Sequence, residues 1–398
     1  MAISSAEIHS KLKEFFGYTG FKGDQEKIIT NLLQGNDAFV IMPTGGGKSL
    51  CYQLPALLMP GTAIVVSPLI ALMKNQVDAI RGFVSGNEGI AHFLNSSLNK
   101  AQIAEVAADL KAGVTKLLYV APESLTKEEN IAILNDVHIS FYAIDEAHCI
   151  SQWGYDFRPD YLQIGKIREV VDAPVIALTA TATPEVADDI MEKLGFKEKT
   201  LLKSGFERPN LSYIVRKCED KMGQMINICN GVPGTGIVYV RSRKKTEELA
   251  AALAAVGISS SFYHAGLRHE QRMKRQEDWK SGKTRVMVCT NAFGMGIDKP
   301  DVRFVVHMDM PDAPEAYFQE AGRAGRDGLH SFAVLLWNST DIRRLHQLET
   351  ISFPTLEYIE DIYHKVYAFF EIAYGQGLGR QLKFDLNEFC RRFSLNRS

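Results

Sequence analysis

Short apolar runs alternate with segments of helical spacing along most of the chain, and this alternation limits the fold more than any other feature. One set of candidate strands comprises residues 37–42, 62–67, 116–121, 140–145 and 174–179. A second set comprises residues 235–240, 260–264, 285–290, 302–308 and 331–336. Runs that are apolar throughout are typical of parallel strands buried on both faces. The sequence therefore predicts an α/β protein with parallel sheets flanked by helices.

The two sets of strands indicate two domains in tandem, which a length of 398 residues also favours. Between them lies the polar stretch 203–212, which we interpret as a linker. We therefore expect a first domain at residues 1–205 and a second at residues 206–340.

Both ends of the chain are predicted to be helical. Ser4 and Glu7 form a capping-box pattern at the start of an N-terminal helix that Gly17 ends. After Pro354, apolar side chains recur at helical spacing: Leu356, Ile359, Ile362, Tyr363, Val366, Phe370 and Ala373. A glycine-rich break at 375–381 and a short amphipathic helix at 385–395 follow. Residues 341–398 are thus expected to form a helical appendage, or the start of a further domain.

The segment MPTGGGKS, residues 42–49, follows a candidate strand and precedes a helical pattern, as a phosphate-binding loop does. The amides of Thr44, Gly45, Gly46 and Gly47 can approach phosphates closely, and the following helix N-terminus favours an anion. Lys48 would reach the β- and γ-phosphates, and the Ser49 hydroxyl would bind Mg²⁺. An ordinary glycine-rich turn is the alternative, since Met42 stands where the strict pattern begins with glycine.

An acidic pair, Asp145 and Glu146, ends the apolar run 140–145. Asp145 is suited to hold Mg²⁺, and Glu146 to position and deprotonate an attacking water. Acidic pairs at strand ends are common on protein surfaces, so this pair indicates a catalytic site only in combination with the lysine loop at residues 42–49. Together the two motifs predict a nucleotide-hydrolysing site.

An aromatic-rich stretch follows the acidic pair directly, within DEAHCISQWGYDFRPDY at 145–161. It contains Trp153, Tyr155, Phe157 and Arg158. Stacking of a base on an aromatic ring contributes about 1–3 kcal/mol and tolerates any nucleotide sequence. The alternative is that these rings fill the core, but the glycine, aspartate and proline between them suit a loop better.

The segment QEAGRAGRDG, residues 319–328, carries two arginines in a glycine-rich setting in the second domain. Placed across a cleft, Arg323 and Arg326 would meet the charge that develops on a γ-phosphate. A solvated basic turn is the alternative. The presence of the other two motifs favours the arginine-finger role.

Taken together, these motifs resemble those of superfamily 2 helicases, and DEAH continued by CISQWGYDFRP resembles the RecQ family of DNA helicases. The resemblance covers roughly residues 8 to 340. Its other segments are FGYTGFKGDQ (16–25), SPLIALMKNQ (67–76), YVAPESL (119–125), LTATAT (178–183), FERPN (206–210), YHAGL (263–267) and TNAFGMGIDKPDVRFVVH (290–307). It implies two RecA-like P-loop domains that bind ATP and Mg²⁺ between them, and translocation 3′ to 5′ on single-stranded DNA.

The resemblance also assigns roles to single residues. Phe16, Tyr18, Lys22 and Gln25 would contact the adenine, although Lys22 stands where the family usually has arginine. Asp298 would contact the ribose or the interface between the domains. Gln319 would join Arg323 and Arg326 as a catalytic residue, and Thr179 and Thr181 would link hydrolysis to the interface.

For DNA, the resemblance points to Trp153, Phe157 and Arg158 as the sensing loop. Phosphate contacts are expected from basic side chains: Lys74, Arg241, Arg243, Lys244, Arg268 and Lys274. The net charge of −2 offers no overall attraction to DNA, so such contacts must be local. His264 and Cys149 are interpreted as packing residues.

Several classes of protein are disfavoured. The six cysteines contain no C-x-x-C pair, and residues 341–398 hold only Cys390, so no zinc is expected. Either this branch lacks the family's zinc module or the chain is a truncated form of a longer protein. The chain has no apolar signal segment and no run of membrane length, so we expect a cytoplasmic protein, nucleoid-associated if bacterial. We also expect a monomer.

The sequence thus predicts a DNA-stimulated, MgATP-dependent helicase of DNA repair and recombination, acting on single-stranded, tailed or forked DNA. One alternative is an RNA-directed helicase or remodeller of the same superfamily. Another is a DNA translocase that cannot unwind without accessory domains. A binding module with an inactive nucleotide site is disfavoured by the intact Lys48, Asp145, Glu146 and Arg326.

Overall fold

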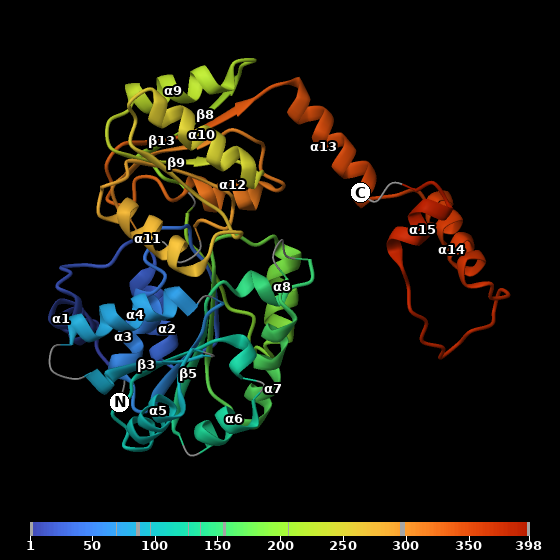
Figure 1. The fold of residues 1–398 in the computed structure, drawn as a ribbon. Helices are drawn as coiled ribbons and strands as arrows, with labels where there is room; N and C mark the ends of the chain where they lie inside the picture. Colours follow the sequence, from blue (N-terminus) through green and yellow to red (C-terminus); the bar gives the residue numbers. More distant parts are fainter. Residues whose placement is uncertain are drawn as a thin grey trace. The chain divides into compact units, whose positions relative to one another are not determined.

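The computed structural model describes residues 3–68, 70–84, 88–95, 97–125, 127–135, 137–153, 157–205, 207–294 and 299–395. The chain forms two compact units, Met1–Leu336 and Trp337–Ser398. The first unit contains two sheets, drawn in blue to green and in yellow to orange in Figure 1. We call the part built on each sheet the first lobe, residues 3–205, and the second lobe, residues 207–336.

The first lobe is built on a seven-stranded sheet of order β3-β4-β2-β5-β6-β1-β7, paired in parallel throughout. Its strands are β1 (Ala38–Ile41), β2 (Thr62–Val66), β3 (Ala91–Leu94), β4 (Leu117–Val120), β5 (Ile139–Ile144), β6 (Val175–Thr179) and β7 (Leu201–Lys203). Its α-helices are α1 (Ser5–Phe16), α2 (Gln25–Leu33), α3 (Leu50–Leu58), α4 (Ile70–Phe83), α5 (Lys100–Lys111), α6 (Glu128–Asn135), α7 (Gln163–Val170) and α8 (Pro184–Lys193).

Helices cover both faces of this sheet, and each face has its own core. Along β1, Ala38 and Val40 pack with α1–α4, whereas Phe39 and Ile41 pack with α5–α8. Figure 1 shows α1–α4 on one side of the strands and α7 and α8 on the other. A strand with both faces buried must be apolar at every position, which explains the continuous apolar runs in the sequence.

The second lobe repeats this arrangement on a six-stranded sheet of order β10-β11-β9-β12-β13-β8. Its strands are β8 (Leu211–Lys217), β9 (Thr235–Tyr239), β10 (Ser260–Tyr263), β11 (Val286–Cys289), β12 (Val302–His307) and β13 (Ser331–Trp337). Its helices are α9 (Lys221–Gly231), α10 (Arg243–Ala255), α11 (His269–Lys280) and α12 (Pro314–Ala321). One core includes α9 and α10 and the other includes α11 and α12.

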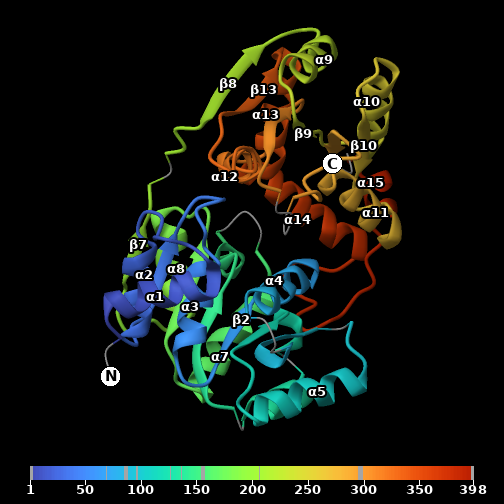
Figure 2. The same ribbon diagram turned by 90° about the vertical axis from the view of Figure 1, so that its left-hand side faces the viewer.

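All ten predicted strands are present within one or two residues, and the α/β class is confirmed. Three strands were not predicted, and all three lie at sheet edges: β3 and β7 in the first sheet and β8 in the second. β7 and β8, both labelled in Figure 2, are largely exposed and need no apolar run, although β8 begins with the buried Leu211. β3 is mostly buried, but it has only four residues and contains the polar His92.

The second unit contains helices α13 (Ser339–Ser352), α14 (Leu356–Phe370) and α15 (Leu386–Arg392). The two helices predicted here are present, although α14 ends before Ala373. Aromatic rings hold the unit together: Phe369 lies 5.4 Å and Phe384 lies 5.2 Å from Phe389, measured between ring centroids.

One buried ion pair fastens the first strand of the first lobe to its surroundings. Both carboxylate oxygens of Asp37 accept hydrogen bonds from Arg168 Nη2 at 2.7 Å. The same carboxylate accepts from the backbone N–H of Val175 at 2.9 Å and of Lys197 at 3.0 Å. Asp37 therefore joins the start of β1 to α7, to β6 and to the segment before β7.

Replacing Asp37 with Asn should destabilise the protein by about 3–5 kcal/mol, because the buried Arg168 guanidinium would lose its counter-charge. Urea denaturation followed by circular dichroism measures this loss. The Asp172→Asn variant is the control, since its ion pair with Lys197 is exposed and should leave the midpoint unchanged. Equal midpoints for the two variants would contradict the role given to Asp37.

Candidate active site

The sheet order of the first lobe brings three strand ends together. β5, β6 and β1 are neighbours, and all three run in the same direction. Their carboxyl ends lead into Asp145, Thr179 and the loop 42–49. Ligands of open α/β sheets bind at this edge, so the fold itself assembles the residues that the sequence predicts for one site.

The loop between β1 and α3 is shaped for close approach to a ligand. Gly47 has a φ of 82°, and a Cβ atom placed on it would lie 2.4 Å from Gln25 Nε2. A Cβ atom on Gly46 would lie 2.6 Å from the Met42 side chain. Glycine is therefore required at both positions. Lys48 Nζ donates to the Met42 carbonyl at 3.3 Å, which folds the lysine side chain over the loop.

Gln25 is buried and connects the start of α2 to this loop. Its Nε2 donates to the carbonyls of Gly46 at 3.2 Å and Gly47 at 3.1 Å, and its Oε1 accepts from the Lys22 N–H at 2.8 Å. A few residues before Gln25 in the sequence, the rings of Phe16 and Tyr18 are stacked, with centroids 6.4 Å apart. Tyr18 is half exposed, as a ring that stacks on a base must be.

Asp145 and Glu146 follow β5 and lie in contrasting surroundings. Asp145 is buried, and burial together with the charge of Glu146 raises its pKa to about 7, while Lys48 acts in the opposite direction. Glu146 adopts a left-handed backbone with a φ of 49°. Among the described residues, no hydrogen bond reaches its buried Oε2 atom. An acceptor that lacks a hydrogen bond and lies beside a buried acid fits a site that takes up a metal ion and a water molecule.

A chain of polar contacts leads from Glu146 to the end of β6. His148, in the short helix η3 (Ala147–Ile150), lies 3.5 Å from Glu146 Oε2 and 3.0 Å from Thr179 Oγ1 through Nδ1. Thr179 Oγ1 in turn donates to the Thr181 carbonyl at 3.1 Å. The two threonines therefore connect the acidic pair to the pocket described below.

The two arginines of the second lobe have different surroundings. A Cβ atom placed on Gly45 would lie 3.3 Å from Arg326 Cγ, so Arg326 reaches the phosphate loop. Arg323 is buried and donates to the Gly294 carbonyl within its own lobe. Gln319 is half buried on α12. Only Arg326 of the pair therefore adjoins the loop.

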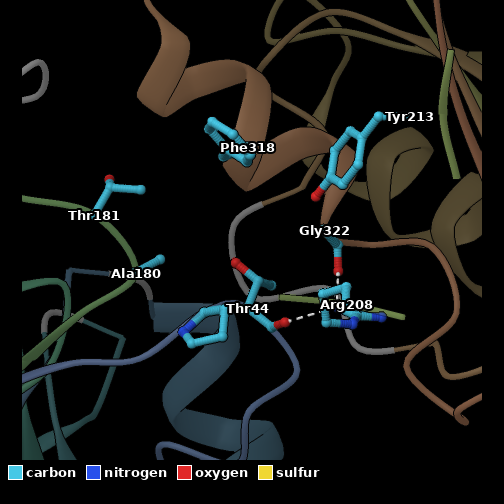
Figure 3. Close-up of a pocket in the computed structure, with 8 residues that line it drawn as sticks. Thr44, Ala180, Thr181, Arg208, Tyr213, Phe318 and Gly322 are labelled. Atoms are coloured by element: carbon cyan, nitrogen blue, oxygen red, sulfur yellow. Dashed lines mark hydrogen bonds between the residues drawn. The ribbon is translucent and has the colours of Figure 1, made fainter. Parts of the chain in front are cut away.

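Gly322 brings the second lobe against the phosphate loop. A Cβ atom placed on it would lie 3.2 Å from Thr44 Cβ and 2.9 Å from the Phe318 carbonyl. Both lobes line the pocket at this contact: Pro43, Thr44, Ala180, Thr181, Arg208, Tyr213, Phe318 and Gly322 (Figure 3). One lining residue, Arg208 of the linker, was given no role by the sequence interpretation.

Comparisons with known proteins agree with this geometry. The DEAD/DEAH box helicase family model matches residues 22–190, and the helicase conserved C-terminal domain matches residues 220–328. The chain is 43% identical over 369 residues to the ATP-dependent DNA helicase RecQ of Haemophilus influenzae, covering 92% of this chain and 59% of that protein. It is 40% identical over 361 residues to the probable ATP-dependent DNA helicase RecS of Bacillus subtilis, covering 89% of this chain and 72% of that protein.

The chain belongs to the RecQ family of helicases. Among solved structures, the helicase MrfA bound to DNA superposes with a TM-score of 0.70 at 18% identity, covering 87% of this chain and 53% of that one. That likeness shows the fold alone, and it confirms the two RecA-like lobes. The chain spans 59% of the length of the Haemophilus influenzae relative, so the activity of a whole RecQ protein does not transfer to it directly.

The aromatic-rich loop of this RecQ chain lies next to the acidic pair in space as well as in sequence. Trp153 is 78% exposed, which excludes the alternative that it fills the core, and Phe157 is half buried. Tyr161, in η4 (Pro159–Leu162), donates through its hydroxyl to the Asp145 carbonyl at 3.2 Å. The Arg158 N–H donates to the Cys149 carbonyl at 2.8 Å. Both ends of the loop are therefore anchored beside Asp145 and Glu146.

The predicted phosphate-binding side chains are mostly available to solvent. Lys74 on α4 is exposed, as are Arg243, Lys244, Arg268 and Lys274 of the second lobe. Arg241 is the exception, because it is half buried and its guanidinium pairs with Asp312. His264 and Cys149 are buried, with His264 Nε2 3.2 Å from Glu247 Oε1, in agreement with a packing role.

Two predicted residues, Asp298 and Tyr155, lie outside the residues that the structure describes. Across the described ranges, no group of three or more His, Cys, Asp or Glu side chains is arranged to hold a metal ion. Nor does any helix within those ranges have the length and apolarity needed to cross a membrane.

Replacing Gly322 with Ala should lower the ATP turnover rate at least fivefold, equivalent to about 1 kcal/mol, because the added methyl group pushes α12 away from Thr44. Turnover is measured at saturating ATP and DNA, with thermal melting as a check on folding. The Gly231→Ala variant is the control, since a Cβ atom there meets nothing within 4 Å. Wild-type turnover in the Gly322 variant would show that the close contact is dispensable.

Proposed function

We propose that this chain is the core of an ATP-dependent DNA helicase. MgATP binds at the phosphate loop, and its hydrolysis drives movement 3′ to 5′ along single-stranded DNA and the opening of tailed or forked duplexes in DNA repair and recombination. The observation that carries the proposal is the anchoring of the exposed aromatic loop to Asp145 through Tyr161. A base stacked on Trp153 would thereby act on the hydrolytic residues.

Within the proposed site, each residue has a distinct task. Lys48 and the loop amides would hold the phosphates, while Ser49 and Asp145 would hold Mg²⁺, which would supply positive charge to the phosphate oxygens. Glu146 orients the attacking water and accepts its proton through Oε2, which accepts no hydrogen bond among the described residues. Arg326 supplies positive charge from the second lobe, and the buried Arg323 holds the loop that carries it.

DNA is favoured over RNA because the Haemophilus influenzae and Bacillus subtilis relatives are named as DNA helicases. A translocase that does not separate strands is the second candidate, because the Haemophilus influenzae relative extends well beyond the region that this chain matches. Comparing ATPase stimulation by single-stranded DNA with that by RNA of equal length separates the nucleic acids. Preferential stimulation by RNA would overturn the assignment to DNA.

A strand-displacement assay on duplexes with a 3′ or a 5′ single-stranded tail tests the proposal directly. The chain should displace the strand only from the 3′-tailed duplex and only with MgATP. Lys48→Ala, which loses the phosphate contact, and Glu146→Gln, which loses the base, should abolish turnover while retaining DNA binding. DNA-stimulated hydrolysis without displacement would favour the translocase, and turnover by the Glu146 variant would contradict its role.

Replacing Trp153 with Ala should reduce the stimulation of ATPase activity by DNA roughly tenfold, because loss of one stacked base weakens binding by about 1–3 kcal/mol. Basal hydrolysis and the melting temperature should not change, since the side chain is exposed. Phe353→Ala is a matched control, because this ring is 80% exposed in the other unit. An equal loss of basal and stimulated activity would contradict a DNA-sensing role.

A further inference from the structure

The side chain of Arg208 joins the phosphate loop to the loop that carries the two arginines, residues 322–328, which we call the arginine loop. Its Nη1 donates to the carbonyls of Thr44 at 3.0 Å and Gly322 at 3.4 Å. Its Nη2 donates to the carbonyls of Ala324 at 2.9 Å and Gly325 at 2.8 Å. Figure 3 shows the guanidinium between Thr44 and Gly322, with a dashed line to each.

The remaining donor of this guanidinium, Nε, bonds Asn210 Oδ1 at 3.3 Å. An arginine side chain has five N–H donors. The acceptors named here for Arg208 are four backbone carbonyls and one side-chain amide oxygen, all of them neutral. Among the described residues, no carboxylate contributes to the electrostatic surroundings of Arg208, which are set by burial and by Tyr213. A charge in this position is partly desolvated, and burial lowers the pKa of Arg208 accordingly.

The positive charge of Arg208 lies beside the phosphate loop. A Cβ atom placed on Gly45 would lie 3.5 Å from Arg208 Nη1 and 3.3 Å from Arg326 Cγ. The two arginines therefore meet the same turn of the phosphate loop from the same direction. A bound triphosphate would bring negative charge to the place where Arg208 now has only carbonyl dipoles.

We propose that Arg208 is a positioning residue that couples the presence of the γ-phosphate to the placement of Arg326. This inference rests on the proposed nucleotide site. The guanidinium holds the arginine loop against Thr44, and the terminal phosphate of ATP supplies the counter-charge that makes this arrangement favourable. ADP lacks that phosphate, so the contact discriminates between the two nucleotides.

Nucleotide binding to Arg208→Lys and Arg208→Gln tests the inference. Fluorescently labelled ADP and a non-hydrolysable ATP analogue are titrated with each variant and with the wild type. For Arg208→Gln the Kd of the analogue should rise about tenfold, equivalent to about 1.4 kcal/mol, while the Kd of ADP changes less than twofold. Arg208→Lys keeps the charge but not the planar fork, and should give a smaller rise.

Arg285→Gln is the matched control. Arg285 also donates to backbone carbonyls, including Gly234 at 2.9 Å and Val232 at 2.7 Å, but entirely within the second lobe. Its loss should affect stability and leave the ratio of the two Kd values unchanged. A purely structural role for Arg208 would likewise weaken ADP and the analogue equally, and that outcome would overturn the inference.

A double-mutant cycle with Arg326→Gln tests whether the two arginines act together. If Arg208 works by placing Arg326, adding Arg208→Gln to Arg326→Gln should weaken the analogue by less than twofold more. Fully additive losses would overturn the coupling. Absence of any nucleotide binding by the wild type would instead refute the proposed site itself, so the two failures are distinguishable.

Discussion

The burial of the Asp145 carboxyl beside Lys48 is the constraint on which the rest of the site depends. A desolvated acid next to a second acid is unfavourable, and this raises its pKa to about 7. The fold maintains the arrangement because three neighbouring parallel strands deliver the acid, the threonine and the lysine loop to one edge of a rigid sheet. Under the proposed function, a divalent cation and a triphosphate would relieve the unfavourable charges, so that affinity for MgATP would depend on the geometry of the sheet.

The segment after Asp145 connects this buried acid to the protein surface. Tyr161 is fully buried and holds the Asp145 carbonyl, while Trp153, eight residues before it, is largely in solvent. Trp153 is thus exposed, whereas Tyr161 is fixed in the core. Under the proposed function, a base that binds Trp153 would act on residues whose side chains have few alternative positions, because the surrounding core is close-packed.

The interior strands and the nucleotide motifs could be predicted from the sequence because their signals are local. Burial on both faces makes an interior strand apolar throughout, and a phosphate loop needs its glycines and lysine in a fixed order. The edge strands β3, β7 and β8 lack that signal. Arg208 was missed for a different reason: four of its five acceptors are backbone carbonyls, which any residue type provides. Likewise, the sequence treats Arg323 and Arg326 alike, and only the tertiary structure buries the first and brings the second to Gly45.

Lys48 and Arg208 both donate hydrogen bonds to backbone carbonyls around the same loop. Lys48 donates to the Met42 carbonyl and Arg208 to the Thr44 carbonyl. Hydrogen bonds to an anionic oxygen are roughly twice as strong as those to a neutral one. Under the proposed function, a phosphate that enters the loop would give Lys48 a stronger partner than the Met42 carbonyl. The same phosphate would place negative charge beside Arg208 while its carbonyl contacts persist, so the arginine loop would be held most firmly when the terminal phosphate is present.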